Sequence, residues 1–276
     1  MKVQWYPGHM AKATRLMKEQ LKTVDIVIEV CDARAPLASR NDVLSSALGG
    51  KKRIVAYNKS TLADKQISEN WMAHLTAGGE LCVFTDAMAR EGIKQLRELL
   101  IDEAAGKMRY NRAVRAMVTG IPNVGKSMLI NSLTFSSGVK TGNRPGLTRG
   151  NQWLRIDEKL HLLDTPGVLA PKIESDYDAF CLAAIGCVKD TIFDKYEACI
   201  EIVDFMRRYY PALLLSRYKL EAIDDDSVVV LEDIARRRGF FMRGGEVDLN
   251  RLADTLYDEF KNGKIGRMSL QCPEEK

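Results

Sequence analysis

One stretch of this chain constrains both its local backbone and the kind of ligand that it binds. Residues Gly120–Ser127 match the phosphate-binding pattern G-x-x-x-x-G-K-[ST] at every fixed position. The apolar run 113–119 before it is typical of a strand, and the segment that begins at Ser127 is typical of a helix. A glycine-rich turn between strand and helix directs backbone N–H groups at a phosphate, and the helix N-terminus adds partial positive charge. The stretch therefore predicts a P-loop in an α/β fold.

The side chains of this loop predict separate roles. Lys126 is expected to neutralise the β- and γ-phosphates of a nucleotide, and the hydroxyl of Ser127 is expected to bind Mg²⁺. The other nucleotide contacts that we predict in this region are Asn123, Val124, Gly125 and Met128.

Two further elements follow the P-loop in the order expected of a switch-type nucleotide hydrolase. The apolar run 160–164 ends in D-x-x-G, in which Asp164 can hold Mg²⁺ through water and Gly167 can contact the γ-phosphate. Between them, the turn-rich segment 141–149 places Thr148 where it can meet Mg²⁺ when a γ-phosphate is present. D-x-x-G is common by chance, so the order of the three elements carries the prediction.

The remaining elements come in an unusual order. The base-recognition element Asn58-Lys59 precedes the P-loop, whereas it usually follows it. Residues 24–36 resemble the strand that normally follows D-x-x-G, and residues 82–87 resemble the strand and loop that cup guanine. Asp86 and Ala87 in this loop are predicted nucleotide contacts. The first hundred residues therefore supply the back half of a GTPase sheet and residues 113–170 its front half. We predict an α/β fold with a P-loop GTPase sheet in circularly permuted order.

A series of motifs runs along the chain in one order: Trp5–Met10, Asp32–Pro36, Asn58–Lys59, Gly120–Ser127 and Asp164–Gly167. This series resembles that of the ribosome biogenesis GTPase A family, from Trp5 to about Leu270. The resemblance implies a GTPase that acts in late maturation of the large ribosomal subunit. It implies Mg²⁺ as cofactor, GTP and GDP as ligands, and the precursor of that subunit, with its rRNA and ribosomal proteins, as partner.

The resemblance also assigns the catalytic residues. Many GTPases place a glutamine after D-x-x-G to orient the attacking water, but Val168 stands there. The family likeness points instead to His9 as the water-positioning group, while an exposed histidine without a role is the alternative. It also makes Asn123 a K⁺ ligand, although Asn123 could equally stabilise the turn. The predicted catalytic set is His9, Lys126, Thr148 and Gly167, and the predicted Mg²⁺ ligands are Ser127, Thr148 and Asp164.

The chain departs from the family in the base-recognition element. The family pattern is N-K-x-D, and here the residues are Asn58, Lys59, Ser60 and Thr61. The missing carboxylate normally accepts two hydrogen bonds from guanine, each worth about 1.5–3 kcal/mol, so its loss could weaken GTP binding by about two orders of magnitude. We expect Thr61→Asp to tighten GDP and GTP binding; no gain would mean that another group already reads the base. Ser60 is a further predicted nucleotide contact.

Two other functions remain open because of Thr61. One is an rRNA- or ribosome-binding scaffold of the same fold with a weakened nucleotide site. The other is a P-loop enzyme of ATP or mixed specificity. Intact Lys126, Ser127, Thr148 and Asp164 argue against a decayed site.

The layout predicts two domains. Residues 1–172 form the permuted GTPase domain, and residues 175–276 form a helical domain that binds rRNA, with helices over 193–210, 228–238 and 249–261 and Asp248 as the cap of the last. We expect the GTP state to be coupled to the orientation of the helical domain, since D-x-x-G lies directly upstream. Candidate rRNA contacts are Arg207, Arg208, Arg217, Arg236, Arg237, Arg238 and Arg243, with surface ion pairs as the alternative.

Composition adds limits without deciding the function. The formal net charge of +4 is mild, and basic residues of the predicted helix 9–23 form either an RNA-contacting stripe or a solvated face. The six cysteines show no C-x-x-C spacing, so we expect reduced thiols and no zinc site. No apolar run reaches membrane-spanning length and no signal peptide is recognised, so we expect a cytoplasmic monomer without a membrane partner.

Overall fold

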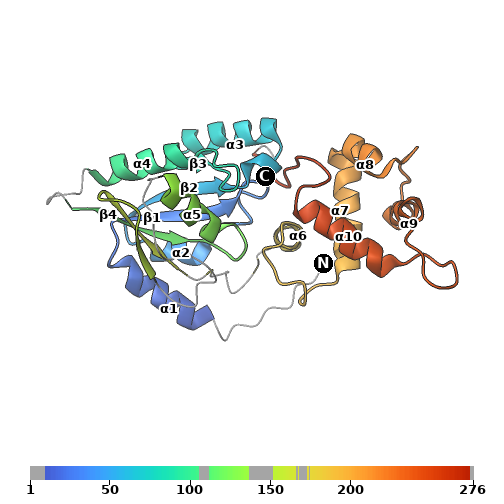
Figure 1. The fold of residues 1–276 in the computed structure, drawn as a ribbon, viewed down its shortest axis with the longest axis horizontal. Helices are drawn as coiled ribbons and strands as arrows, with labels where there is room; N and C mark the ends of the chain where they lie inside the picture. The colour runs from blue at the N-terminus through green and yellow to red at the C-terminus, as the bar shows by residue number, and fades with distance from the viewer. Residues whose placement is uncertain are drawn as a thin grey trace. The chain divides into compact units, whose positions relative to one another are not determined.

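The structure is a computed structural model that describes residues 10–105, 112–136, 152–165, 167, 173 and 175–273. These residues form two compact units (Figure 1). The sheet unit holds the described residues up to Gly167 together with Ser269–Pro273, and the helical unit holds the described residues of Ile173–Met268. Each unit is described by itself.

The sheet unit is built on six strands in the order β3-β2-β1-β4-β6-β5. Their pairing is parallel except for β5, which runs antiparallel to β6 at one edge. β1 is buried along its whole length, as expected of an inner strand with covered faces. The strands are β1 (Ile26–Asp32), β2 (Lys52–Asn58), β3 (Cys82–Phe84), β4 (Val114–Thr119), β5 (Gln152–Arg155) and β6 (Leu160–Asp164).

The register confirms that two segments exchanged in chain order form one sheet. β4 leads into the P-loop and pairs on one side with β1, where Glu29 lies opposite Thr119. On its other side β4 pairs with β6, where Val118 lies opposite Asp164. The predicted permuted α/β sheet is therefore confirmed. The sequence did not predict the edge strand β5.

The helices of the sheet unit pack their apolar side chains on the sheet. Val27, Met117 and Leu163 stand side by side in register and pack with Met17 and Leu21 of α1. Farther along the sheet, the β2 side chains pack with Trp71 of α3. The helices are α1 (Met10–Leu21), α2 (Asp42–Ala47), the short 3₁₀ helix η1 (Ser60–Leu62), α3 (Lys65–Ala77), α4 (Ile93–Ala105) and α5 (Lys126–Ser136).

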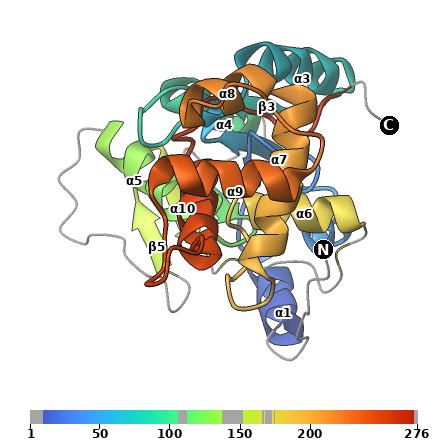
Figure 2. The ribbon, with the colours of Figure 1, turned by 90° about the vertical axis from the view of Figure 1, so that its right-hand side faces the viewer.

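The helical unit is arranged around α7, which contacts the other four helices (Figure 2). Its buried side chains include Ile202, Leu231 and Leu256. The predicted cap Asp248 accepts a hydrogen bond from the Arg251 N–H at 3.0 Å, and α10 has the predicted bounds. The helices are α6 (Asp176–Ala184), α7 (Lys195–Tyr209), α8 (Pro211–Tyr218), α9 (Ser227–Arg238) and α10 (Leu249–Lys261).

The sequence did not predict α8 because Pro211 was interpreted only as a helix stop. Proline is well tolerated in the first turn of a helix, where its missing N–H needs no partner. Pro211 therefore follows the end of one helix and begins the next, since α7 ends at Tyr209 and α8 begins at Pro211.

Most of the arginines proposed as rRNA contacts are engaged within the helical unit. Arg217 and Arg238 both pair with Glu259, at 2.5 and 3.1 Å. Arg208 and Arg243 make no ion pair within the described part of the chain. For the paired arginines the ion-pair alternative has structural support: these are Arg207, Arg217, Arg236, Arg237 and Arg238.

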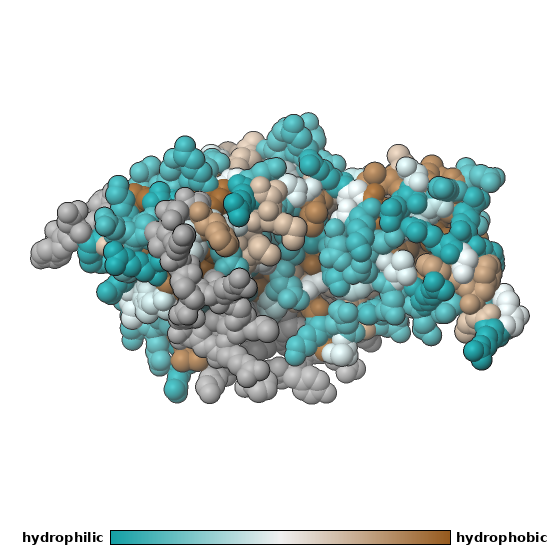
Figure 3. Space-filling model, viewed as in Figure 1, coloured by the Kyte–Doolittle hydropathy of each residue, from teal (hydrophilic) through white to brown (hydrophobic). Residues whose placement is uncertain are grey.

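The molecular surface is largely hydrophilic on the face seen in Figure 3, with apolar residues in small groups over both units. No helix among the described residues is long and apolar enough to cross a membrane. The six cysteines are free thiols in the structure, and four are buried.

Candidate nucleotide site

The P-loop lies between β4 and α5, and glycine is required at two of its positions. Gly120 has φ 151°, and a Cβ there would lie 2.3 Å from the Val30 carbonyl oxygen. Gly125 has φ 96°, and a Cβ there would lie 2.3 Å from Nδ2 of Asn58. Both positions combine a left-handed backbone with a contact that excludes a side chain. The fixed glycines of the motif therefore set how closely the loop approaches β1 and Asn58.

Asn58, at the end of β2, joins the two exchanged segments. Its Nδ2 donates to the Val124 carbonyl oxygen at 2.9 Å, and its Oδ1 accepts from the Ala87 N–H at 3.0 Å. The side chain is buried. One amide thus connects the P-loop with the loop after β3, and the structure brings the predicted base-recognition element to the P-loop.

Lys59 is fixed by a buried carboxylate. Its Nζ lies 2.9 Å from Oδ2 of Asp32, and Arg34 donates to the same carboxylate from Nε at 3.0 Å and Nη2 at 2.9 Å. Burial alone would raise the pKa of the Asp32 carboxyl, but Arg34 and Lys59 hold that pKa well below its ordinary value. The Asp32–Pro36 motif therefore acts on the base-recognition element through Lys59. The sequence placed both motifs in one series but did not predict their contact.

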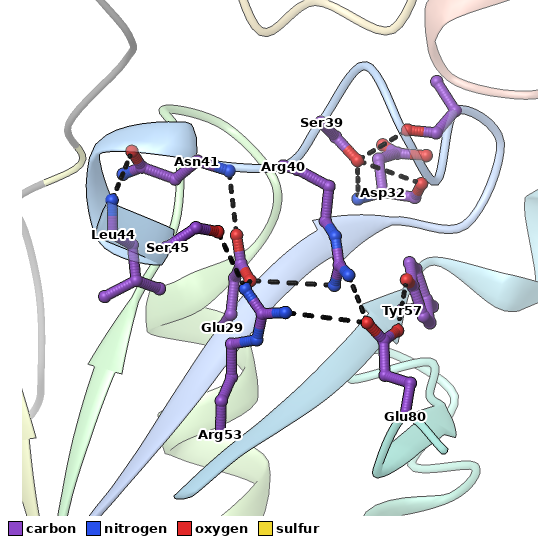
Figure 4. Close-up of polar contacts among 11 residues, drawn as sticks. Glu29, Asp32, Ser39, Arg40, Asn41, Leu44, Ser45, Arg53, Tyr57 and Glu80 are labelled. Atoms are coloured by element: carbon purple, nitrogen blue, oxygen red, sulfur yellow. Dashed lines mark hydrogen bonds and ion pairs between the residues drawn. The ribbon is translucent and has the colours of Figure 1, made fainter. Parts of the chain in front are cut away.

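A second buried carboxylate anchors the segment that follows β1 (Figure 4). Glu29 accepts from the Asn41 N–H at 2.8 Å and pairs with Nη1 of Arg53 at 3.1 Å. Burial raises the pKa of Glu29, although Arg40 and Arg53 act in the opposite direction. Glu80 pairs with both arginines from the other side. This network ties residues 40–41 to β1 and β2, and so fixes the far end of the loop that follows Asp32.

The D-x-x-G element lies against the P-loop. Lys126 Nζ donates to the carbonyl oxygens of Gly120 and Ile121, at 3.1 and 2.6 Å. A Cβ on Gly167 would lie 2.9 Å from Lys126 Nζ and 3.1 Å from the Pro122 nitrogen. The predicted residues Lys126 and Gly167 are therefore adjacent. His9, Thr148 and Val168 lie outside the described residues.

The oxygen donors on these elements suit Mg²⁺. This ion prefers oxygen ligands and is usually held by one or two carboxylates together with phosphate oxygens and waters. Ser127, the second residue of α5, is exposed, and the buried Asp164 ends β6, beside the strand that leads into the P-loop. A Cβ at Gly167 would meet the Lys126 side chain and the P-loop backbone at Pro122, so the chain at Gly167 passes close to the P-loop. The residues present thus fit the metal.

Asn123 has a left-handed backbone, with φ 62°. Asparagine adopts this conformation more readily than most residues, which supports its role in the turn. Its role as a K⁺ ligand stays a prediction. Met128, also expected near the nucleotide, has 44% of its surface exposed.

Thr61, at the position of the missing aspartate, is bonded to a carboxylate from another loop. It lies in η1 beside Ser60, and its hydroxyl donates to Oδ2 of Asp86. The Ser60 N–H donates to the Thr85 carbonyl oxygen at 3.0 Å and so joins the two loops. Asp64 is used elsewhere, because its carboxylate caps α3 by accepting from the Ile67 N–H at 3.1 Å. The sequence predicted Asp86 as a nucleotide contact but did not predict its bond to Thr61.

The C-terminal segment, Ser269–Pro273, belongs to the sheet unit. The Asp64 N–H donates to Ser269 Oγ at 3.1 Å, and the Trp71 indole N–H donates to the Gln271 carbonyl oxygen at 2.8 Å. The side chain of Gln271 accepts from the Leu37 N–H at 2.8 Å. The sequence assigned all of 175–276 to a helical domain. These contacts correct that boundary, since the last described residues bind the loops after β1 and β2.

The site has the features of a family of known proteins. Residues 115–226 match the family described as 50S ribosome-binding GTPase. Over 282 residues the chain is 39% identical to Ribosome biogenesis GTPase A of Bacillus cereus, covering 100% of this chain and 95% of the relative. It is 41% identical over 283 residues to the protein of that name from Priestia megaterium, covering 100% and 98%.

Solved structures agree with these sequence relatives. The GDP-bound structure of TM YlqF superposes with a TM-score of 0.69 at 28% identity, covering 95% of this chain and 100% of that chain. The crystal structure of GNP-bound YlqF from T. maritima gives a TM-score of 0.67 at 28% identity, covering 96% and 100%. With this likeness over the whole chain, and with Asn58 joining a permuted P-loop to its base-recognition loops, the chain belongs to the ribosome biogenesis GTPase A family.

Proposed function

We propose that this protein hydrolyses GTP and acts in the maturation of the large ribosomal subunit in the cytoplasm. The observation that carries the proposal is the pair of hydrogen bonds that Asn58 makes with Val124 and Ala87. These bonds bring the phosphate-binding and base-recognition elements together at the carboxyl ends of β2, β3 and β4. Relatives that share this chain over its full length bear the name Ribosome biogenesis GTPase A. GTP and GDP are therefore the proposed ligands.

The residues near the P-loop have separate proposed roles in binding the phosphates and Mg²⁺. Lys126 would neutralise charge on the β- and γ-phosphates, and the Gly167 N–H would contact the γ-phosphate. Ser127 and Asp164, together with Thr148, would hold Mg²⁺, which supplies charge neutralisation across the β- and γ-phosphate oxygens when bound. The adjacency of Gly167 and Lys126 supports this division.

The attacking water needs a group that orients it. We assign this role to His9, because the family resemblance points to it and Val168 has no polar side chain. K⁺ at Asn123 would add positive charge near the phosphates. Both assignments rest on the resemblance.

The γ-phosphate is proposed to act on the helical unit through a short connection. Only a few residues separate Gly167 from Ser175, the N-cap of α6. If a γ-phosphate orders Gly167, the short connection would transmit this change to the start of the helical unit. Small-angle scattering and proteolysis at 170–178 should differ between GDP and a GTP analogue, and identical results would contradict the coupling.

The helical unit is proposed to contact rRNA. A cavity of about 470 Å³ in this unit is lined by Arg217, Tyr218, Lys219, Arg237 and Arg238. Glu259 neutralises part of this charge, whereas Lys219 is exposed. Lys219, Arg208 and Arg243 are therefore the stronger candidates for phosphate contacts.

A second function is favoured by one observation, the absence of a carboxylate at position 61. A ribosome-binding scaffold with a weakened nucleotide site would lack this carboxylate. Titration of the purified protein with fluorescent GDP and ADP, followed by phosphate release with large-subunit precursors, separates the two functions. Selective GDP binding and stimulated GTP turnover are expected. Binding to the precursor without GDP binding would support the scaffold, and equal binding of ADP would support a nucleotidase of mixed specificity.

A further inference from the structure

We propose that Thr61 and Asp86 read guanine together: the carboxylate of Asp86 holds the proton of the Thr61 hydroxyl, so that Thr61 presents only acceptor lone pairs to the base. This inference rests on the proposed GTP site and names the pair that selects its base. It concerns two loops that follow β2 and β3, and a contact between residues 25 positions apart in the chain.

The carboxylate of Asp86 is held in a fixed position. Its Oδ1 accepts from the N–H groups of Met88 and Ala89, each at 2.8 Å, and its Oδ2 accepts from Thr61. Asp86 is 5% exposed. The bond from the Ser60 N–H to the Thr85 carbonyl oxygen, at 3.0 Å, aligns the two loops beside this contact. The position of the Thr61 hydroxyl proton is therefore set by the fold.

This arrangement gives a hydroxyl the selectivity of a carboxylate. A hydroxyl has one donor and two acceptor lone pairs, so a free threonine could donate to adenine N1 as readily as accept from guanine N1–H. Once the proton points at Asp86, only the lone pairs remain. They accept from guanine N1–H or N2–H and meet the N1 lone pair of adenine with repulsion. The negative charge behind the hydroxyl strengthens it as an acceptor.

The other carboxylates near the base-recognition element have different partners. Asp32 is bonded to Arg34 and Lys59, and Asp64 caps α3. Asp86 contacts the residue at the position from which the family's aspartate reads guanine. In this chain the carboxylate has thus moved from the loop after β2 to the loop after β3, with Thr61 as the intermediate contact.

The contact with Asp86 reverses the expected effect of Thr61→Asp. An aspartate at 61 would place a second carboxylate against Asp86, and like charges at this distance disfavour ionisation of both. We therefore expect Thr61→Asp alone to weaken GDP binding. Adding Asp86→Ser removes the repulsion and leaves one carboxylate at position 61. The double variant should recover selective GDP binding.

The test compares the wild-type full chain with T61D, D86S and T61D/D86S by titration with fluorescent GDP and ADP. Each single substitution should weaken GDP at least about tenfold, the effect of one lost charge-assisted hydrogen bond, and D86S should lower the GDP-to-ADP preference. The double variant should bind GDP more tightly than either single variant. Tighter GDP binding by T61D, or an unchanged preference in D86S, would overturn the proposal.

A second pair of variants separates the role in recognition from a role in folding. Thr61→Val keeps the shape of the side chain, leaves Asp86 in its turn and removes the hydroxyl, whereas Thr61→Ser keeps the hydroxyl. We expect T61V to lose GDP preference while it still unfolds in one cooperative thermal transition, and T61S to retain the preference. Equal preference in T61V and wild type would contradict the inference. A wild-type protein that binds neither nucleotide would instead contradict the proposed function itself.

Discussion

Asn58 donates to the Val124 carbonyl oxygen at 2.9 Å across 66 positions of the chain. The two residues belong to segments whose order is exchanged relative to ordinary GTPases, and β1 and β4 pair in parallel between them. A single buried amide therefore links the folding of the two segments to the assembly of the nucleotide site.

Asn58→Ala should impair stability and nucleotide binding together. The substitution leaves the buried Val124 carbonyl and Ala87 N–H without their partner, which costs about 1–3 kcal/mol of unfolding free energy. GDP affinity should fall at least about tenfold, because the P-loop loses its tie to the base-recognition loops. Thermal unfolding and GDP titration measure the two effects. Asn70→Ala is the control, since its side chain accepts a hydrogen bond from the exposed Gln66, and a similar loss there would contradict the prediction.

Gly125→Ala should weaken nucleotide binding through a contact with Asn58 and not through backbone strain alone. The added Cβ would lie 2.3 Å from Asn58 Nδ2 and displace that amide from Val124 and Ala87. Two lost hydrogen bonds of about 1.5 kcal/mol correspond to about a hundredfold weaker GDP binding. Isothermal titration with GDP measures it.

Gly79→Ala is the matched control for this substitution. Gly79 also has a left-handed backbone, with φ 77°, but a Cβ there would have no atom within 4 Å. It therefore carries the strain without the clash, and we expect a lower melting temperature with unchanged GDP affinity. Equal affinity of both alanine variants would show that the contact with Asn58 does not decide binding.

Asp32→Asn should destabilise the protein at neutral pH, and the difference from wild type should shrink in acid. The folded-state pKa of Asp32 lies below its ordinary value of 3.8, so its contribution is present above that value and is lost as the pH falls toward the folded-state pKa. Breaking a buried pair of this kind costs about 3–5 kcal/mol. Melting temperatures of wild type and variant between pH 7 and pH 3 measure the difference, with the exposed Asp42→Asn as control. A difference that grows in acid would contradict the sign.

The sequence predicted the parts of the site that depend on local chemistry. Gly120 and Gly125 are required by backbone conformation and close approach, so their spacing identified the loop together with Lys126, Ser127 and the flanking strand and helix. The contact between Thr61 and Asp86 depends on how two loops align after folding, and neither residue alone indicates it. Arg34 and Lys59 likewise meet at Asp32 only once β1 and β2 are paired.

Contacts that return from a distant part of the chain were also missed. Residues 269–273 were assigned to the helical domain because they follow its last predicted helix. Their hydrogen bonds to Trp71 and Asp64 span 200 and 205 positions, and no local pattern encodes such a pairing. The edge strand β5 was missed because its short sequence carries no strong alternation.

Removal of the C-terminal segment should destabilise the sheet unit. A chain that ends at Met268 leaves the indole N–H of the buried Trp71 without the Gln271 carbonyl oxygen, and the Asp64 N–H without Ser269. An unsatisfied buried donor costs about 1–3 kcal/mol. We expect a lower melting temperature and weaker GDP binding, because Asp64 lies two residues after the 3₁₀ helix that carries Thr61.

Trp71→Phe isolates one of these bonds in the full-length chain. Phenylalanine keeps most of the apolar contact with β2 and removes only the indole donor, so we expect a smaller loss of stability than the truncation gives. Trp153→Phe is the control, since Trp153 is 44% exposed.

Because the C-terminal segment holds the end of the base-recognition loops, hydrogen exchange at the Asp64 amide should accelerate in the truncated chain. Protection of that amide equal to wild type would show that the segment does not bind there.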